Sequence, residues 1–340
     1  ISWDADMVVD KHSMGGIPGS RITMVVIPIV AAHGLTIPKT SSRAITSPAG
    51  TADAMEVLAR VDLDDEAVRR VVRETNGCIV WNGRLNHSRV DEVMNAITRP
   101  LRIDSLRWSV ASILSKKLAA GASHCLIDVP VGPTAKVRND AEAYELRDLF
   151  VYVGTALGLR VEVRLTDGRA PIGRGIGPAL EARDVVSVLR NDADAPADLR
   201  DKALSFASSI LSFDPAMSES EAEARARALI ESGAAYETFQ RIVSAQGRPD
   251  EPVEIGRYRS TVLAGTAGRV DSIDCFALAG IARMAGAPVD KGAGLDLLVQ
   301  PAGLVTADTP LYRIHASDEA MLGAARALAA SDHAFRIVPG

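Results

Sequence analysis

The feature that most constrains the fold of this chain is a strand–loop–helix pattern that occurs twice near its N-terminus. Residues 6–10 (DMVVD) have the apolar character of a short strand, a glycine-rich loop follows, and residues 21–33 form an apolar helical pattern that stops at Gly34. Residues 35–40 are a second extended segment, and the stretch SSRAITSPAGTAD leads from it into the helical pattern of residues 54–59. Strands separated by helices favour a parallel sheet covered by helices.

The same alternation continues through the middle of the chain. Helical patterns cover residues 106–120, 141–156 and 177–189, and strand patterns cover residues 125–129 and 159–165. We therefore predict an α/β fold with a central, mostly parallel sheet flanked by helices.

The last part of the chain differs from the rest. Residues 191–244 are rich in alanine and helical in pattern, and a soft boundary follows at residues 246–252. Beyond it, residues 258–314 are rich in glycine and strand-like, and a last helical pattern covers residues 318–330. We predict two domains: residues 1–245, which hold the α/β sheet, and residues 246–340, a small C-terminal α+β subdomain.

Composition excludes several classes of protein. Hydrophobic residues make up 47% of the 340 residues and charged residues 24%, as in a globular protein of about two domains. The formal net charge of -5 provides no basic field for a nucleic-acid polymer. The longest apolar run, residues 24–32, is shorter than the ~20 residues of a transmembrane helix, so we expect no membrane partner. Cys78, Cys125 and Cys275 lie far apart, which predicts a reducing, cytoplasmic setting and no metal site.

The first loop, VDKHSMGGIPG, combines groups that bind an oxyanion such as phosphate. Glycines between a strand and a helix let backbone N–H groups approach a ligand, and the helix N-terminus adds partial positive charge. Lys11 would add a full charge, Ser13 and Thr23 hydroxyl donors, and His12 a group that titrates near neutral pH. The loop lacks the GxxxxGK[ST] and GxGxxG spacings, so alone it also fits an ordinary polar turn. Because ligands gather at the carboxyl ends of parallel strands, we expect the second hydroxyl-rich loop to face the same ligand.

Four ordered segments resemble one enzyme family. DKHSMGG, IPKTSSRAITSPAGTAD, ASILSKKLAAG and IDVPVGPTAK are similar to segments of the thymidine and pyrimidine-nucleoside phosphorylases, and the likeness runs from Met7 to about Leu328. The stretch SSRAITSPAGTAD resembles the type 2 branch, which contains archaeal AMP phosphorylases and bacterial proteins that carry the thymidine phosphorylase name. The resemblance implies the nucleoside phosphorylase and phosphoribosyltransferase type of α/β fold, with a barrel-sandwich-like C-terminal subdomain. Residues 98–120 would then contribute to a small helical lobe that binds the base.

The activity that the resemblance implies is phosphorolysis, in which inorganic phosphate attacks the anomeric carbon of a sugar while the base departs. Phosphate is then a co-substrate and no cofactor is required. His12 lies where the family places a histidine beside the base, and Asp104 matches the proton donor. The positions that match the family's phosphate ligands are Lys11, Ser13, Gly16, Thr23, Ser41 and Thr51.

A second set of positions is implied to bind the nucleoside or nucleotide: Ser42, Arg43, Ala44, Ile45, Thr46, Ser47, Ser112, Lys116 and Lys136. Ser112 and Lys116 are four residues apart and share a helix face, and the planar fork of Arg43 suits a phosphate group. Plainer interpretations stay open for some residues. Asp104 would also serve as a helix N-cap, and Lys116 and Lys136 would also suit a solvated surface.

These residues are compatible with several functions. The first is phosphorolysis of a pyrimidine nucleoside such as thymidine, giving free base and (deoxy)ribose 1-phosphate; the second uses a nucleoside 5′-monophosphate (AMP, CMP or UMP) and gives ribose 1,5-bisphosphate. A phosphoribosyltransferase would need acidic magnesium ligands, and of the acidic residues only Asp53 and Glu56 lie near the loops, where the start of a helix explains them. Because the family's preceding helical segment is absent from these residues, a non-catalytic fragment is a further alternative. We expect a homodimer when that segment is present.

Asp104→Asn tests the proton-donor role. A donor has to be protonated before the base leaves, so we expect burial or a neighbouring carboxylate to raise the pKa of Asp104. The substitution should lower kcat by roughly 10²–10⁴ and abolish the loss of activity as pH rises through that pKa. A pH–rate profile checks this, and an unchanged profile in the variant would contradict the assignment.

Overall fold

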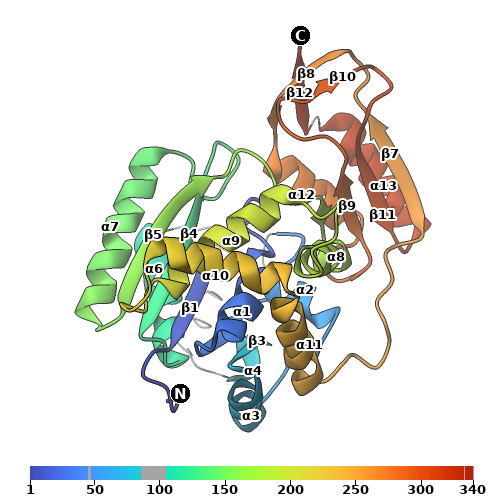
Figure 1. The fold of residues 1–340 in the computed structure, drawn as a ribbon. Coiled ribbons are helices and arrows are strands. Elements are labelled where there is room, and N and C mark those ends of the chain that lie inside the picture. The colour runs from blue at the N-terminus through green and yellow to red at the C-terminus, as the bar shows by residue number, and fades with distance from the viewer. Residues whose placement is uncertain (45–46, 86–104, 333, 340) are drawn as a thin grey trace.

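Parallel strands form the centre of the larger domain (Figure 1). The structure is a computed structural model that describes residues 1–44, 47–85, 105–332 and 334–339. In chain order the strands are β1 (Val9–Ser13), β2 (Ile37–Ser41), β3 (Gly77–Trp81), β4 (His124–Val131) and β5 (Arg160–Asp167). This arrangement confirms the predicted α/β class.

β1 lies in the middle of these strands, because the chain adds β2 and β3 on one side of it and then β4 and β5 on the other. β1 pairs with β4, β4 with β5, and β2 with β3. An isolated parallel bridge between Val8 and Thr36, with a hydrogen bond of 2.9 Å from Val9 N to Thr36 O, joins β1 to β2. The order is therefore β3-β2-β1-β4-β5, and the chain leaves β1 on one side and later returns on the other. Such sheets bind ligands at this switch point, beyond the carboxyl ends of the strands.

Helices cover both faces of the sheet. The residues of β4 alternate: Leu126 packs with the first set of helices, whereas Cys125 and Ile127 pack with the second. The first set is α1 (Ile22–His33), α8 (Pro178–Leu189), α9 (Ala197–Leu211), α10 (Glu219–Glu231) and α11 (Ala234–Gln246). The second set is α6 (Leu106–Ala119) and α7 (Asp140–Ala156), and α2 (Thr51–Glu56), α3 (Asp65–Thr75) and α4 (Asn82–Leu85) lie around β2 and β3 in the chain.

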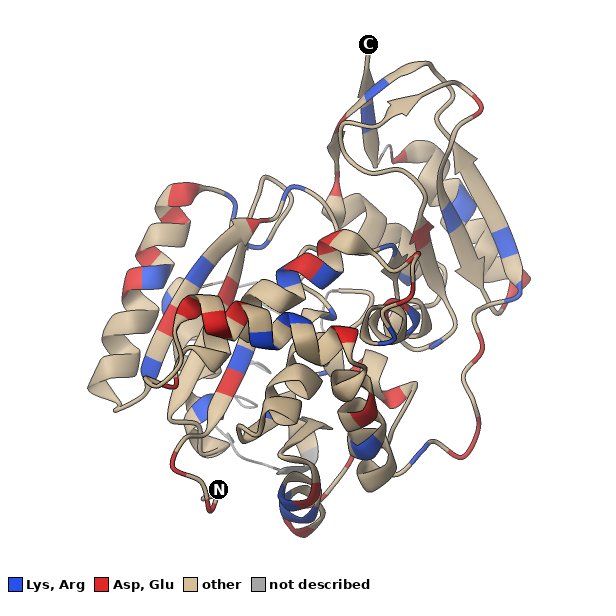
Figure 2. Cartoon of the chain, viewed as in Figure 1, with Lys and Arg blue, Asp and Glu red and all other residues tan. Residues whose placement is uncertain are grey.

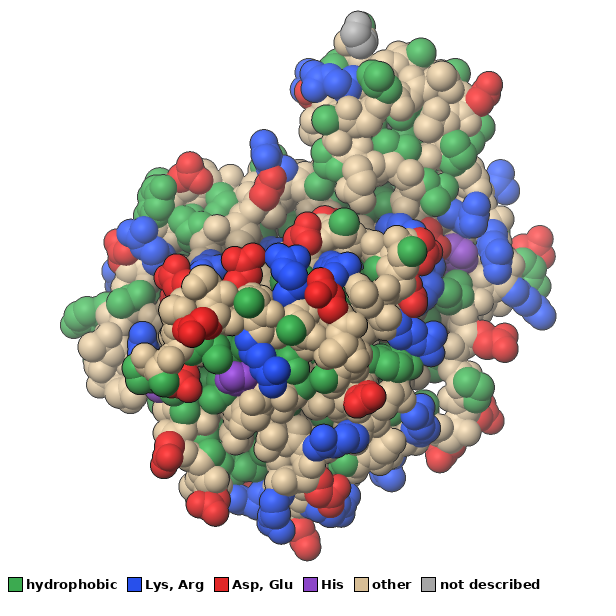
Figure 3. All heavy atoms as spheres, in the orientation of Figure 1, with side chains coloured by type: hydrophobic (Ala, Val, Ile, Leu, Met, Phe, Trp, Pro, Cys, Tyr) green, Lys and Arg blue, Asp and Glu red, His purple; other side chains and the backbone are tan. Residues whose placement is uncertain are grey.

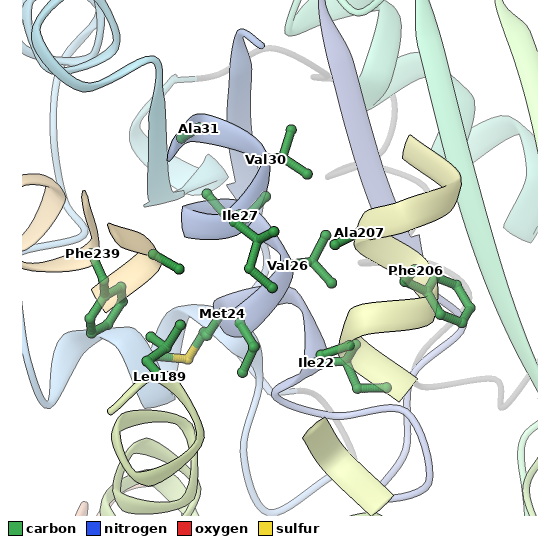
Figure 4. Close-up of a cluster of buried hydrophobic side chains, with 14 of the residues drawn as sticks. Ile22, Met24, Val26, Ile27, Val30, Ala31, Leu189, Phe206, Ala207 and Phe239 are labelled. Atoms are coloured by element: carbon green, nitrogen blue, oxygen red, sulfur yellow. The ribbon is translucent and has the colours of Figure 1, made fainter. Parts of the chain in front are cut away.

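The helix that follows β1 is buried on all sides. In Figure 4, Phe206 and Ala207 of α9 lie on one side of α1, and Leu189 of α8 and Phe239 of α11 lie on the other. A helix that is apolar all round is typical of the interior of a protein, so its N-terminus is held firmly beside the end of β1. Among the described residues, no helix is long and apolar enough to cross a membrane.

The C-terminal part forms a second, smaller unit, drawn in orange and red in Figure 1. One sheet has the order β6-β9-β11-β7 and the other the order β10-β8-β12. The short strand β6 precedes α8 in the chain and pairs with β9, so the larger domain contributes a strand to this unit. The elements are β6 (Gly175–Ile176), β7 (Tyr258–Leu263), β8 (Gly268–Ile273), α12 (Cys275–Met284), β9 (Gly294–Leu297), β10 (Leu304–Val305), β11 (Pro310–Ala316), α13 (Glu319–Ser331) and β12 (Phe335–Val338).

Several elements differ from the sequence-based expectation, and α3 and β3 were not predicted. β1 continues to Ser13 because it pairs residue by residue with β4, so the Lys-His-Ser run lies on the strand and not in the loop. α2 begins at Thr51 because the Asp53 carboxylate accepts a hydrogen bond of 2.9 Å from Gly50 N and closes the first turn. α12 interrupts the region expected to be strand-like, because Asp274 caps its N-terminus.

Phe239→Ala should destabilise the protein by about 3–5 kcal/mol, because the ring is fully buried against α1 and its removal leaves a cavity. Tyr152→Ala is a matched control, since Tyr152 is 74% exposed on α7 and its loss should change the free energy of unfolding by less than about 0.5 kcal/mol. Chemical denaturation measures both. Equal effects in the two variants would show that α1 does not form the core described here.

Candidate active site

Lys11 is fully buried near the carboxyl end of β1. Its Nζ lies 3.4 Å from Thr23 Oγ1, at the start of α1, and 5.3 Å from the centroid of the Phe206 ring. Burial lowers the pKa of Lys11 to about 8, although the nearby Asp128 carboxylate opposes the shift. The structure thus brings together Lys11 and Thr23, two of the predicted phosphate ligands, in a position where a bound anion would stabilise the ammonium form.

A buried ion cluster lies next to Lys11. The Asp10 carboxylate accepts a hydrogen bond of 2.8 Å from Lys117 Nζ and lies 3.4 Å from Lys39 Nζ. Adjacent acidic and basic residues on β1 are visible in Figure 2. Burial is the main cause of the lowered pKa of Lys39, with the positive charge of Lys117 adding to it. One carboxylate thus faces two lysines, and the lowered pKa of Lys39 limits the positive charge that is left unpaired there.

His12 is half-buried on β1 and is held in its neutral form. Burial is the main cause of its lowered pKa, and the positive charges of Lys117, Lys39 and Lys116 act in the same direction. A neutral imidazole offers one N–H donor and one acceptor. This chemistry suits a hydrogen bond to a heterocyclic base and does not suit an ion pair with phosphate.

The carboxyl ends of β1, β4 and β5 meet at Asp128. Its buried carboxylate accepts a hydrogen bond from the Ser13 hydroxyl and another, of 2.6 Å, from Thr166 Oγ1. Lys202, from α9, places Nζ 3.2 Å from Asp128 Oδ2 and 2.9 Å from Thr166 Oγ1. We call Ser13, Asp128, Thr166 and Lys202 the Asp128 network. It occupies the switch point of the sheet.

Glycines are required where the first loop turns and where it passes β4. Gly15 and Gly16 have φ angles of +89° and +77°, which side chains rarely adopt. A Cβ atom at Gly19 would lie 2.8 Å from Ser13 Oγ and 3.0 Å from Pro130 Cγ. The loop therefore lies directly against the Asp128 network.

The second loop folds back on α2. Asp53 Oδ2 accepts hydrogen bonds from Ala44 N at 2.6 Å and from Gly50 N at 2.9 Å. The Arg43 guanidinium forms two hydrogen bonds of 2.5 Å with the Glu56 carboxylate, which Lys291 of the C-terminal unit also reaches at 2.5 Å. The two acidic residues considered as magnesium ligands are thus occupied by cations of the protein. The predicted anion-binding fork of Arg43 is occupied by a carboxylate of the chain itself.

The predicted base-binding residues of α6 are also paired. Lys116 Nζ donates a hydrogen bond of 3.0 Å to Ser112 Oγ, which confirms that the two side chains share a helix face. The N-cap of α6 is Ser105, whose hydroxyl accepts a hydrogen bond from Trp108 N. Lys136 is exposed in the loop after β4.

The remaining predicted site residues fall into two groups. Ser41 ends β2 beside β1, Thr51 begins α2, and Ser42 and Ser47 lie in the loop between them. Asp104, Ile45 and Thr46 lie outside the described residues, and their catalytic and binding roles stay predictions; the N-cap role considered for Asp104 belongs to Ser105.

Several polar residues of the site were not predicted: Asp10, Lys39, Lys117, Asp128, Thr166 and Lys202. Asp128 interrupts the apolar strand CLIDV, whereas Lys39, Lys117 and Lys202 lie in stretches of mixed polarity that give no such signal. A charged residue inside a buried strand normally has a partner, and that is the signal that could have marked Asp128.

Comparison with known proteins identifies the class. Residues 5–236 match the glycosyl transferase family, a/b domain, and residues 269–335 match the pyrimidine nucleoside phosphorylase C-terminal domain. The chain belongs to this glycosyl transferase family, and the resemblance inferred from its motifs is confirmed.

Two relatives carry the same name, bifunctional ribose 1,5-bisphosphokinase-thymidine phosphorylase. The protein from Azorhizobium caulinodans is 62% identical over 338 residues, which are 99% of this chain and 49% of that protein. The protein from Cupriavidus necator is 59% identical over 329 residues, 96% of this chain and 55% of that protein. The chain thus spans about half the length of these relatives.

Solved structures confirm the fold. Anthranilate phosphoribosyltransferase from Thermus thermophilus has a TM-score of 0.58 at 18% identity and covers 72% of this chain and 80% of its own. The enzyme from Saccharomyces cerevisiae, in complex with PRPP and Mg, has a TM-score of 0.53 at 17% identity, over 70% and 73% of the two chains. At these identities the likeness describes architecture only.

The affinity for inorganic phosphate should fall as pH rises through about 8, because Lys11 loses its charge there. Lys202→Met removes a positive charge that lowers the pKa of Lys11, so the midpoint of this loss should move to higher pH. Isothermal titration calorimetry across pH 6–10 measures both midpoints. A midpoint that is unchanged by the substitution would contradict the assignment to Lys11.

Proposed function

We propose that the protein carrying this chain cleaves the N-glycosidic bond of a pyrimidine nucleoside such as thymidine by phosphorolysis, giving free base and (deoxy)ribose 1-phosphate. The observation that carries the proposal is the buried Lys11 on β1, whose Nζ lies 3.4 Å from Thr23 Oγ1 beside the glycine loop; the neutral His12 follows it on the same strand. The relatives named thymidine phosphorylase add support.

The protein would contribute to this reaction mainly by positioning the phosphate and the sugar and by electrostatic stabilisation of the transition state. Phosphate attacks the anomeric carbon as the base leaves, so no side chain has to act as the nucleophile. Lys11, Thr23 and the backbone of the glycine loop would hold phosphate beneath the sugar. His12 would hydrogen-bond the base, and Asp104 would supply the proton to it. Closure of the domains would keep water from the sugar.

Phosphorolysis of a nucleoside 5′-monophosphate is the second candidate. Its sugar product, ribose 1,5-bisphosphate, is the compound named in the kinase half of the two relatives' shared name. Arg43 and Lys291 converge on Glu56 beside the second loop, and both cations suit a 5′-phosphate. In this alternative, the ligand would compete with Glu56 for Arg43.

A phosphorolysis assay separates the candidates. Free base should appear from thymidine in the presence of phosphate and not in its absence, whereas release from AMP or CMP at a higher kcat/KM would favour the nucleotide reaction. Chromatography of the base and the sugar phosphate measures each product. Release of base from a nucleoside 5′-monophosphate that needs pyrophosphate and magnesium in place of phosphate would indicate a phosphoribosyltransferase, and no release from any of these substrates would favour a binding module.

A further inference from the structure

The Ser13 hydroxyl donates its only hydrogen bond to Asp128. A serine hydroxyl has one O–H donor and two acceptor lone pairs, whereas a carboxylate only accepts. In the hydrogen bond between Ser13 Oγ and Asp128 Oδ2, the serine must therefore be the donor. Ser13 remains partly exposed, so what it offers a ligand is an acceptor.

The rest of the Asp128 network holds this polarity in place. Thr166 Oγ1 donates to the other carboxylate oxygen at 2.6 Å, and Lys202 Nζ lies 3.2 Å from the oxygen that Ser13 uses. Asp128 is fully buried, and the parallel register of β1 and β4 sets Ser13 directly opposite it. A buried carboxylate that loses a hydrogen-bond donor destabilises the protein, and this cost favours the orientation in which Ser13 donates to Asp128.

We propose that Ser13 and Asp128 form a selectivity device that accepts a hydrogen bond from a protonated oxygen of a tetrahedral oxyanion. Hydrogenphosphate carries one P–OH group, which would donate to Ser13 Oγ. Its unprotonated oxygens would then face Lys11, Thr23 and the N–H groups of the glycine loop, and one of them remains free to attack the sugar. Binding transfers no proton between the ligand and the protein.

Sulfate is the anion that tests this selectivity. It has nearly the same size and shape as phosphate but carries no proton at neutral pH, so its oxygens would meet the lone pairs of Ser13. Arsenate does carry As–OH groups and should behave like phosphate. The inference rests on the proposed function, because that function supplies the reason for phosphate to bind at this loop.

The experiment compares the dissociation constants of phosphate, arsenate and sulfate by calorimetry at pH 7.5. The wild-type protein should bind phosphate and arsenate more tightly than sulfate, by roughly 10- to 100-fold. Asp128→Asn leaves one acceptor oxygen where the carboxylate has two, so Ser13, Thr166 and Lys202 compete for it and the serine proton becomes available to the ligand; the phosphate-to-sulfate ratio should fall by at least about tenfold. Ser13→Ala removes the acceptor and should lower the ratio in the same direction.

Thr166→Val is the matched control, since it removes a hydrogen bond to the same carboxylate but leaves the oxygen that faces Ser13. It should retain the wild-type ratio even if all three anions bind more weakly. Circular dichroism checks that each variant is folded, and Ser13→Ala keeps the test decisive if Asp128→Asn does not fold. A wild-type ratio in both Ser13→Ala and Asp128→Asn, or equal wild-type binding of phosphate and sulfate, would overturn the inference.

The outcomes also separate this inference from the proposed function. Equal binding of phosphate and sulfate by a protein that still releases base from a nucleoside with phosphate would refute the selectivity device alone. Binding of neither phosphate nor sulfate would remove both the device and the phosphorolytic reaction.

Discussion

The parallel pairing of β1 with β4 is the interaction on which the site depends. In this register Lys11 lies beside Leu126 and Ser13 beside Asp128. Because side chains alternate between the faces of a sheet, a slip of one residue would turn Lys11 and Ser13 to the opposite faces and separate the serine from its carboxylate. The register is held by the apolar alternation of β4, whose residues fill the cores on both sides. Ordinary core packing thus determines where the polar chemistry can form.

Buried charge distinguishes this region from the rest of an acidic chain. The site gathers the ammonium groups of Lys11, Lys39, Lys117 and Lys202 around the carboxylates of Asp10 and Asp128. Outside it, the face in Figure 3 shows acidic and basic side chains interspersed, and the chain as a whole has a net charge of -5. A local positive potential inside a low-dielectric interior can therefore attract phosphate without a basic surface.

Sequence reasoning recovered what depends on local pattern. The apolar run that becomes α1, its stop at Gly34 and the alternation around β4 all follow from periodicity and from one residue's own backbone preferences. Two kinds of feature were missed because they depend on partners far along the chain. The strand β1 was predicted at residues 6–10 and lies at Val9–Ser13, since Lys11, His12 and Ser13 look like loop residues until β4 is in place. The role of Asp128 likewise appears only when β1, β5 and α9 converge on it.

The contribution of β6 to the C-terminal sheet has a consequence for how the protein can be divided. Residues 175–176 pair with β9, and Arg183 of α8 forms an ion pair of 2.5 Å with Asp296 on that strand. A fragment cut at the linker near residue 246 would leave β9 paired with β11 on one side only, and the edge that β6 covers would be open to pairing with other chains. An exchange of this unit between relatives would therefore have to include β6 and α8. The working boundary of the C-terminal unit lies before residue 175, and not at the linker near residue 246.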